Sequence, residues 1–236
     1  MAWVWDLSKV IQRPHPLTFA KRYWPDTTFY REQRQAIVGI KEDVETVIVS
    51  ANKMGKDFGA AYIALSFFLC PQMYFPDHYV AYVESQRRGR PDLLVHTRRV
   101  VTTSIKEDHL RVLWAEIGRF LQTSDVPLID RDGGPLVVND KEIRFREEMH
   151  AKNPINYLIG KVSEKGEGMA GHHAAYTLAV GDEASGLDDQ VYVFMQGWAK
   201  RFLFFGNPHE TQNFWRKMVD GGDVEVKDQP TQEVAA

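Results

Sequence analysis

Eight residues, Ser50 to Asp57, read SANKMGKD and resemble a phosphate-binding loop with two changed positions. Such loops commonly read G-x-x-x-x-G-K-[ST]: backbone N–H groups and the Lys hold phosphates, and the closing hydroxyl binds Mg²⁺. Here Ser50 replaces the first Gly and Asp57 replaces the hydroxyl residue. A carboxylate is also a hard oxygen ligand for Mg²⁺, so the segment predicts a variant nucleotide site. The candidate nucleotide contacts are Ser50, Ala51, Asn52, Lys53, Met54, Gly55, Lys56 and Asp57.

Three of these residues have specific expected roles. Lys56 would reach the β- and γ-phosphates as a point charge. Backbone N–H groups from Gly55 onward would face phosphate oxygens at the N-terminus of a helix. Asp57 has two open interpretations: it ligates Mg²⁺ directly or through a water, or it only caps the helix that follows.

Polar residues also follow two other apolar segments. The run 174–184 ends in Asp182 and Glu183, and Asn207 follows the apolar run that begins at residue 200. The carboxyl ends of parallel strands lie along one edge of a sheet, where α/β proteins bind their ligands. We therefore expect Asp182 to hold Mg²⁺, and Glu183 to orient or deprotonate an attacking water.

The surrounding segments have the periodicities of alternating strands and helices. Apolar spacing predicts helices over 31–42, 57–69, 106–122 and 210–220, and a helix or ordered turn over 191–199. Short apolar runs predict a buried strand over 45–50, further strands over 98–105, 174–184 and 200–208, and a hairpin around Asn139 and Asp140. The Gly-rich stretch 161–173 is expected to be mobile. This alternation predicts a three-layer α/β domain with a mostly parallel central sheet.

The composition is that of an ordinary globular protein. The chain has 236 residues, of which 44% are hydrophobic and 26% charged, enough for one large domain or two small ones. The single cysteine excludes an internal disulfide framework and fits a reducing compartment. No apolar run approaches the roughly 18 residues of a membrane span, and the first ten residues do not read as a signal peptide. We therefore expect a cytoplasmic protein with no membrane partner.

A net charge of −3 means that any nucleic-acid surface must be local. Residues 86–99 hold five arginines and one acid. One interpretation is contact with DNA phosphates or with a neighbouring subunit. The alternative is a solvated loop balanced by nearby acids. The candidate contact residues are Arg87, Arg88, Arg90, Arg98 and Arg99.

Taken in order, several segments between about residues 29 and 216 resemble the ATPase domain of the large terminase subunit, the DNA-packaging motor of tailed bacteriophages and related viruses. FYREQRQAI resembles the adenine-contacting segment of that family, which would assign Tyr30 and Gln33 to the base. SANKMGKD resembles its variant phosphate loop (Walker A), and LAVGDEA resembles its Walker B segment. FFGNPHETQNFW resembles its coupling motif, which would make Asn207 a sensor of the γ-phosphate.

The resemblance implies a three-layer P-loop ATPase domain of the ASCE type over residues 30–220. It also implies an N-terminal aromatic arm packed on the body over 1–29 and a C-terminal tail or linker over 221–236. The implied activity is ATP hydrolysis with Mg²⁺ bound by Asp57 and Asp182, and with Glu183, Lys56 and Asn207 as catalytic residues. The implied partners are double-stranded DNA, other copies of this chain in a ring, a portal protein and a small terminase subunit, in the host cytoplasm during viral assembly.

Some features depart from that family. Asn52 and Lys53 occupy the region where many members carry an Arg early in the phosphate loop, with Lys53 as the candidate substitute. The stretch GEGMAGHH has no Arg where some members place an arginine finger. Arg144, Arg146 and Lys165 are the remaining candidates for that finger. The chain is also expected to lack the RNase H-type nuclease domain of full-length large terminases. Two other classes stay open: a cellular helicase- or recombinase-like ATPase, and a nucleotide-binding assembly module without hydrolysis.

Overall fold

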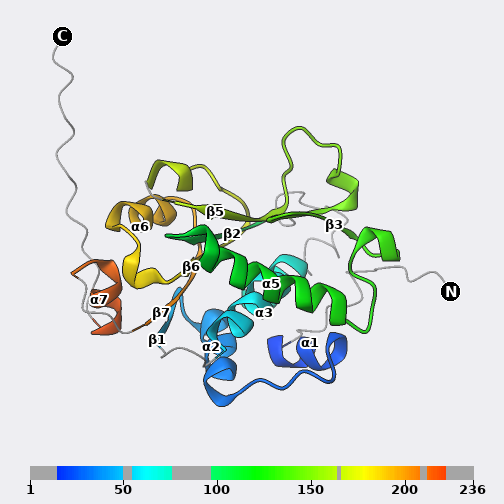
Figure 1. Ribbon diagram of the computed structural model, residues 1–236, viewed down its shortest axis with the longest axis horizontal. Helices are drawn as coiled ribbons and strands as arrows, with labels where there is room; N and C mark the ends of the chain where they lie inside the picture. The colour runs from blue at the N-terminus through cyan, green and yellow to red at the C-terminus, as the bar shows by residue number, and fades with distance from the viewer. Residues whose placement is uncertain (1–14, 50–54, 76–96, 164–165, 208–211, 222–236) are drawn as a thin grey trace, which may run out of the picture.

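A β-sheet separates two layers of helices (Figure 1). The computed structural model describes residues 15–49, 55–75, 97–163, 166–207 and 212–221. Within these ranges the sheet has seven strands in the order β1-β7-β6-β2-β5-β4-β3. The strands are β1 Glu45–Val49, β2 Arg98–Ser104, β3 Leu136–Asn139, β4 Glu142–Phe145, β5 Tyr157–Val162, β6 Tyr176–Asp182 and β7 Arg201–Gly206.

Five neighbouring strands, from β1 to β5 in the sheet order, run parallel. The hairpin β3–β4 adds two antiparallel strands beyond β5. Its turn contains Asp140, whose φ of 42° lies in the left-handed region that tight hairpin turns require. The predicted three-layer fold with a mostly parallel sheet is confirmed, and so is the hairpin.

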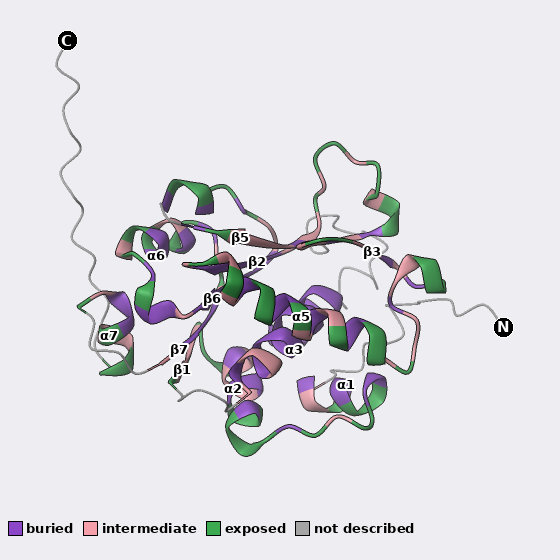
Figure 2. Ribbon diagram, in the orientation of Figure 1, coloured by how far each residue is buried: buried purple, intermediate pink, exposed green. Residues whose placement is uncertain are grey.

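The helices divide between the two faces of the sheet. The first face carries α1 Pro16–Tyr23, α2 Arg31–Glu42, α3 Lys56–Leu69 and α5 Glu107–Thr123, and the second carries α6 Asp189–Gln196 and α7 Phe214–Val219. Each face has its own apolar core, seen as buried ribbon on both sides of the sheet in Figure 2. None of the described helices is long and apolar enough to cross a membrane.

Helix α3 packs against the sheet and is flanked by α2 and α5, so residues 59–69 are all buried. This explains why its sequence has small and large apolar residues on every side rather than one apolar stripe. Helix α5 is amphipathic, as its spacing predicts. Its buried residues are Leu110, Leu113, Trp114, Ile117, Phe120 and Leu121.

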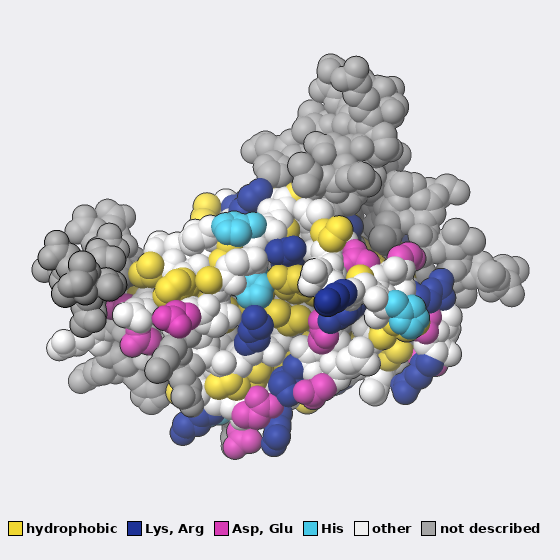
Figure 3. Space-filling model, turned by 90° about the horizontal axis from the view of Figure 1, so that it is seen from above, with side chains coloured by type: hydrophobic (Ala, Val, Ile, Leu, Met, Phe, Trp, Pro, Cys, Tyr) yellow, Lys and Arg dark blue, Asp and Glu magenta, His cyan; other side chains and the backbone are white. Residues whose placement is uncertain are grey.

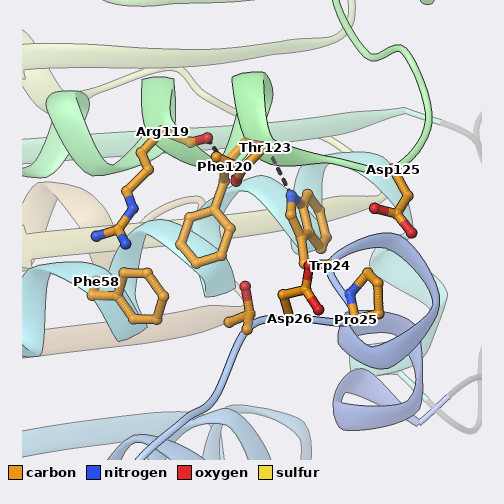
Figure 4. A pocket seen from close by; sticks show the side chains of 9 residues that line it. Trp24, Pro25, Asp26, Phe58, Arg119, Phe120, Thr123 and Asp125 are labelled. Atoms are coloured by element: carbon orange, nitrogen blue, oxygen red, sulfur yellow. Dashed lines mark hydrogen bonds between the residues drawn. The ribbon is translucent and has the colours of Figure 1, made fainter.

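Aromatic residues before α2 anchor the N-terminal segment to this first core. Trp24 is buried, its indole Nε1 donates to the Phe120 carbonyl at 2.7 Å, and its ring meets Tyr62 edge-on. Figure 4 shows this bond from the segment after α1 to α5, beside a pocket of about 270 Å³ that Phe58 and Arg119 also line. Residues 1–14 lie outside the described residues.

Two predictions about strands are wrong. No strand is predicted before or within the Gly-rich stretch 161–173, yet its first two residues belong to β5, which lies between β2 and β4. Gly160 and Lys161 interrupt its apolar run, and Gly160 is needed because a Cβ there would clash with the Trp114 indole. The strand at 45–49 is not buried but lies at the edge of the sheet, and Val49 is exposed.

Candidate active site

The strand order brings three polar strand ends to one edge of the sheet. β7 pairs with β1 on one side and with β6 on the other, and Val49 is in register with Gly206 while Asp182 is in register with Phe205. Lys56 opens the helix that follows β1, Glu183 follows β6, and Asn207 follows β7. The structure therefore brings these three residues together at the carboxyl edge of the sheet.

Glu183 is held between the other two residues. Its Oε1 accepts a hydrogen bond from Lys56 Nζ at 2.5 Å, and its Oε2 accepts one from Asn207 Nδ2 at 3.4 Å. The side chains of Lys56 and Glu183 are only 8% and 16% exposed, so each charge depends on the other for compensation.

The backbone at Glu183 is in an unusual conformation. With φ 48° and ψ 48° it occupies the left-handed region, which a non-glycine residue adopts at a cost of about 1–3 kcal/mol. Gly206 on the neighbouring strand leaves room for this turn, because a Cβ there would lie 3.2 Å from the Ala184 nitrogen. The turn directs the Glu183 carboxylate to Lys56 and Asn207 instead of continuing the alternation of β6.

The start of α3 has the form of an anion site. Gly55 caps the helix with φ 66°, and the 14-residue helix begins directly at Lys56. The first N–H groups of such a helix have no partner within the helix and, with its dipole, favour negative charge. Residues 50–54, which include the predicted contacts Ser50, Ala51, Asn52, Lys53 and Met54, lie outside the described residues.

Gln33 links this loop to α2. Its Nε2 donates to the Gly55 carbonyl at 2.8 Å, and its Oε1 accepts from the Tyr30 N–H at 3.0 Å. The Gln33 side chain therefore holds the backbone at Gly55, the residue before α3, a role that its sequence position did not suggest. Tyr30 is 69% exposed and lines an open groove of about 750 Å³, within the range of small-molecule sites.

Carboxylates crowd the same edge. Asp182 is 2% exposed, and burial, followed by the charges of Asp57 and Glu183, raises its pKa to about 7. Burial also raises the pKa of Asp57, against the opposing effect of Lys56. A bound cation would relieve both effects, and hard carboxylate oxygens are the donors that Mg²⁺ prefers. The residues present therefore fit a magnesium ion.

Phosphate oxygens would have to complete that coordination. Among the described residues, no three His, Cys, Asp or Glu side chains lie close enough together to hold a metal. Proteins commonly bind Mg²⁺ through one or two carboxylates, several waters and substrate phosphates. The expected ligands Asp57 and Asp182 fit a site of this kind, in which waters and phosphates supply the other ligands.

We expect Asp182→Asn to stabilise the metal-free protein at pH 8 and to have little effect at pH 4. The pKa of Asp is about 3.9 in an unfolded chain and about 7 for Asp182 in the fold. The folded state thus binds the proton more tightly and loses stability as pH rises from about 4, with the full loss above pH 7. The gain should be a few kcal/mol in order of magnitude. Denaturant unfolding in EDTA at pH 4 and pH 8 measures this gain in stability. An equal effect of the substitution at both pH values would show that the pKa of Asp182 is not raised.

Arg98 does not belong to an exposed basic surface. It is 7% exposed, its guanidinium donates to the carbonyls of Phe68 and Leu69 at 3.4 and 3.1 Å, and it lies over the Phe145 ring. A basic side chain at the end of a helix satisfies carbonyls that have no partner within the helix. The prediction that Arg98 contacts DNA or a neighbouring subunit is wrong, because its buried side chain bonds the last carbonyls of α3.

Arg99 projects from the other face of β2 and donates to the carbonyls of Ile155 and Gly171. On the surface seen in Figure 3, Lys and Arg side chains are interspersed with Asp and Glu instead of forming a field of one sign. Arg87, Arg88 and Arg90 lie outside the described residues. Of the candidates for an arginine finger, Arg144 is paired with Glu142 at 2.6 Å.

Sequence reasoning missed the end of β2. Thr103 and Ser104 are polar residues at the end of a strand whose centre, Val100 and Val101, is apolar, a signal like the one that identified the acids after β6. Ser104 is in register with Asp182 and is completely buried. The neighbour of a strand in the sheet cannot be read from sequence, so this relation became visible only in the structure.

These features define a three-layer α/β domain whose candidate site lies at the carboxyl edge of a mostly parallel sheet. Among solved structures, the HK97 bacteriophage large terminase is similar, with a TM-score of 0.51 and 12% identity over 83% of this chain and 37% of that chain. A mutant ATPase domain of the Thermus phage P74-26 large terminase gives 0.51 and 11%, over 87% of this chain and 74% of that chain. No protein-family model and no curated protein sequence matches the chain.

The fold is therefore that of the phage large terminase ATPase domains. The resemblance predicted from the sequence is confirmed at this level. The chain spans little more than a third of the HK97 protein, so the comparison covers one part of that larger chain.

Proposed function

We propose that this chain is an ATP-hydrolysing motor domain that drives translocation of double-stranded viral DNA into a procapsid. One observation carries the proposal: Lys56, Glu183 and Asn207 meet at the end of parallel strands, where Glu183 accepts hydrogen bonds from both other residues. The similarity of the fold to phage terminase ATPase domains supports the choice among nucleotide hydrolases.

The geometry suggests how Glu183 would become active. Lys56 occupies one carboxylate oxygen of Glu183, and the γ-phosphate of ATP would compete for the same ammonium group. When Lys56 turns to phosphate, Glu183 is free to orient and deprotonate the attacking water. Asn207 would stay beside Glu183 and respond to the presence of the γ-phosphate.

Asp57 and Asp182 would hold the magnesium ion. When bound, the ion neutralises the charge on the β- and γ-phosphates. Tyr30 would lie against the adenine in its groove, where an exposed aromatic ring offers a face for stacking. Gln33 would keep the phosphate loop in place through Gly55. It would contact the base only with the N–H and the oxygen lone pair of its amide that these bonds leave unused.

The metal role of Asp57 predicts that Asp57→Ala weakens Mg²⁺-ATP binding and turnover, whereas Asp57→Ser keeps both near normal. Serine restores the hydroxyl that such loops usually carry. If Asp57 only caps α3, the alanine variant should lose about 0.5–2 kcal/mol of stability and keep its affinity and turnover. Mg²⁺ titration of nucleotide-dependent thermal stabilisation distinguishes the two results.

We further propose the partners and setting that the resemblance to large terminase subunits implies. These are double-stranded DNA, copies of this chain in a ring, a portal protein and a small terminase subunit in the host cytoplasm. Residues 1–29 would form an arm on an ATPase domain of residues 30–220, followed by a tail or linker. The arginines at 87–90 would contact DNA or a neighbour.

A nucleotide-binding assembly module is the second candidate, because the Lys56–Glu183 pair keeps both groups occupied in the absence of nucleotide.

Phosphate release from Mg²⁺-ATP, measured over a series of protein concentrations with and without duplex DNA, tests this function. A packaging motor should hydrolyse ATP, with turnover that rises as the protein assembles on DNA. Nucleotide binding without phosphate release at any concentration would favour the assembly module. The absence of both binding and hydrolysis would overturn the proposal.

A further inference from the structure

The Ser104 hydroxyl at the end of β2 has no hydrogen-bond partner in the described structure. Ser104 is 0% exposed, and its Oγ is among the buried side-chain atoms that make no hydrogen bond. A hydroxyl buried in this way costs free energy, because folding removes its water and returns no bond. The Ser104 hydroxyl is therefore able to bond a group that joins the site later, if its position allows.

The position of Ser104 indicates what that partner is. It pairs in register with Asp182 on the neighbouring parallel strand. Residues in register on parallel strands project to the same face of the sheet, and here that face is covered by α3, whose first residues are Lys56 and Asp57. At the same edge, Asn207 Oδ1 is also buried without a partner. Two unpaired oxygens thus flank the acid that we expect to bind the cation.

We propose that Ser104 is a further residue of the metal site and hydrogen-bonds a water bound to the Mg²⁺ at Asp182. Mg²⁺ gives up its waters reluctantly and usually keeps several when bound through one or two carboxylates. Such waters are strong donors, and a serine oxygen accepts from them without adding negative charge beside the phosphates. This inference rests on the proposed nucleotide site and adds a residue to it.

Thr103 provides a matched control on the same strand. It is also 0% exposed, and its Oγ1 also lacks a partner. It is in register with Gly181, and a Cβ on Gly181 would meet Phe204 and Leu187 of the second core. Thr103 therefore projects to the face opposite Ser104. Removing its hydroxyl changes an equally buried group that cannot reach the metal.

The experiment compares Ser104→Ala and Thr103→Val with the wild type. Thermal unfolding is recorded first in EDTA and then with ADP over a series of Mg²⁺ concentrations. In EDTA, both variants should unfold at the wild-type temperature or above it, because each loses an unpaired hydroxyl. With ADP, only Ser104→Ala should need about tenfold more Mg²⁺ for half of the stabilisation, as expected for one hydrogen bond to a charged group.

Three outcomes overturn the role of Ser104 alone, and the first two are an unchanged Mg²⁺ half-point in Ser104→Ala and an equal shift in Thr103→Val. A lower unfolding temperature of Ser104→Ala in EDTA would also overturn it, since the hydroxyl would then stabilise the metal-free fold. If the wild type itself shows no Mg²⁺-dependent stabilisation with ADP, the proposed nucleotide site fails, and the role of Ser104 fails with it.

Discussion

Glu183→Gln is expected to retain Mg²⁺-ATP binding and to lower turnover at least about a hundredfold, the scale of losing a general base. Glutamine keeps the size of the side chain and can still accept a hydrogen bond from Lys56, but it cannot take a proton from water. The structure adds a second expectation. Without the negative charge of Glu183, phosphates compete only with a neutral amide oxygen for the Lys56 ammonium. ATP affinity should therefore stay the same or increase.

Phosphate release and equilibrium nucleotide binding measure the two effects separately. Glu167→Gln is a suitable control, because Glu167 is an exposed acid in the 3₁₀ turn Gly166–Met169 and carries the same change of charge. Normal hydrolysis by Glu183→Gln would show that the roles of the acids are wrongly assigned. Loss of binding together with turnover would show that Glu183 serves the fold and not the chemistry.

Lys56→Met is expected to abolish nucleotide-dependent stabilisation. The ammonium group is the expected partner of the β- and γ-phosphates, and methionine keeps only the apolar part of the side chain. The variant should also be less stable without nucleotide, because Glu183 would keep a mostly buried charge with only Asn207 beside it. Breaking a buried ion pair costs about 3–5 kcal/mol, and partial exposure of Glu183 places this case at the lower end.

A double variant separates loss of binding from loss of the fold. Lys56→Met with Glu183→Gln removes both charges, so it should recover most of the lost stability and still fail to bind nucleotide. Lys152→Met, at an exposed position, controls for the loss of one positive charge. Differential scanning fluorimetry with and without Mg²⁺-ATP reports both quantities. Stabilisation by nucleotide that survives in the double variant would refute the phosphate-loop assignment.

The sequence predicted the part of the site that depends on strand ends. Lys56, Glu183 and Asn207 each follow an apolar run, and a parallel sheet brings such ends to one edge whatever the order of its strands. What could not be predicted is which strands are neighbours. The pairing of Ser104 with Asp182 depends on β2 lying next to β6, and no local signal encodes that contact.

Tertiary contacts explain the remaining errors. β5 was not predicted because Gly160 is there to accommodate Trp114, a residue 46 positions earlier in the chain. Arg98 looked like part of a basic loop, yet it folds inward onto the carbonyls at the end of α3. In both cases the residue type is set by a partner distant in sequence, so composition and spacing point to the wrong environment.

The central claim is that the edge formed by Lys56, Asp182 and Glu183 binds ATP together with Mg²⁺. A crystal structure with Mg²⁺ and a non-hydrolysable ATP analogue tests it most directly. We predict the terminal phosphates at the N-terminus of α3, a cation beside Asp182, and Lys56 Nζ moved from Glu183 Oε1, now 2.5 Å away, to a phosphate oxygen. An analogue bound elsewhere, or a Lys56–Glu183 pair left intact beside the bound analogue, would contradict this assignment.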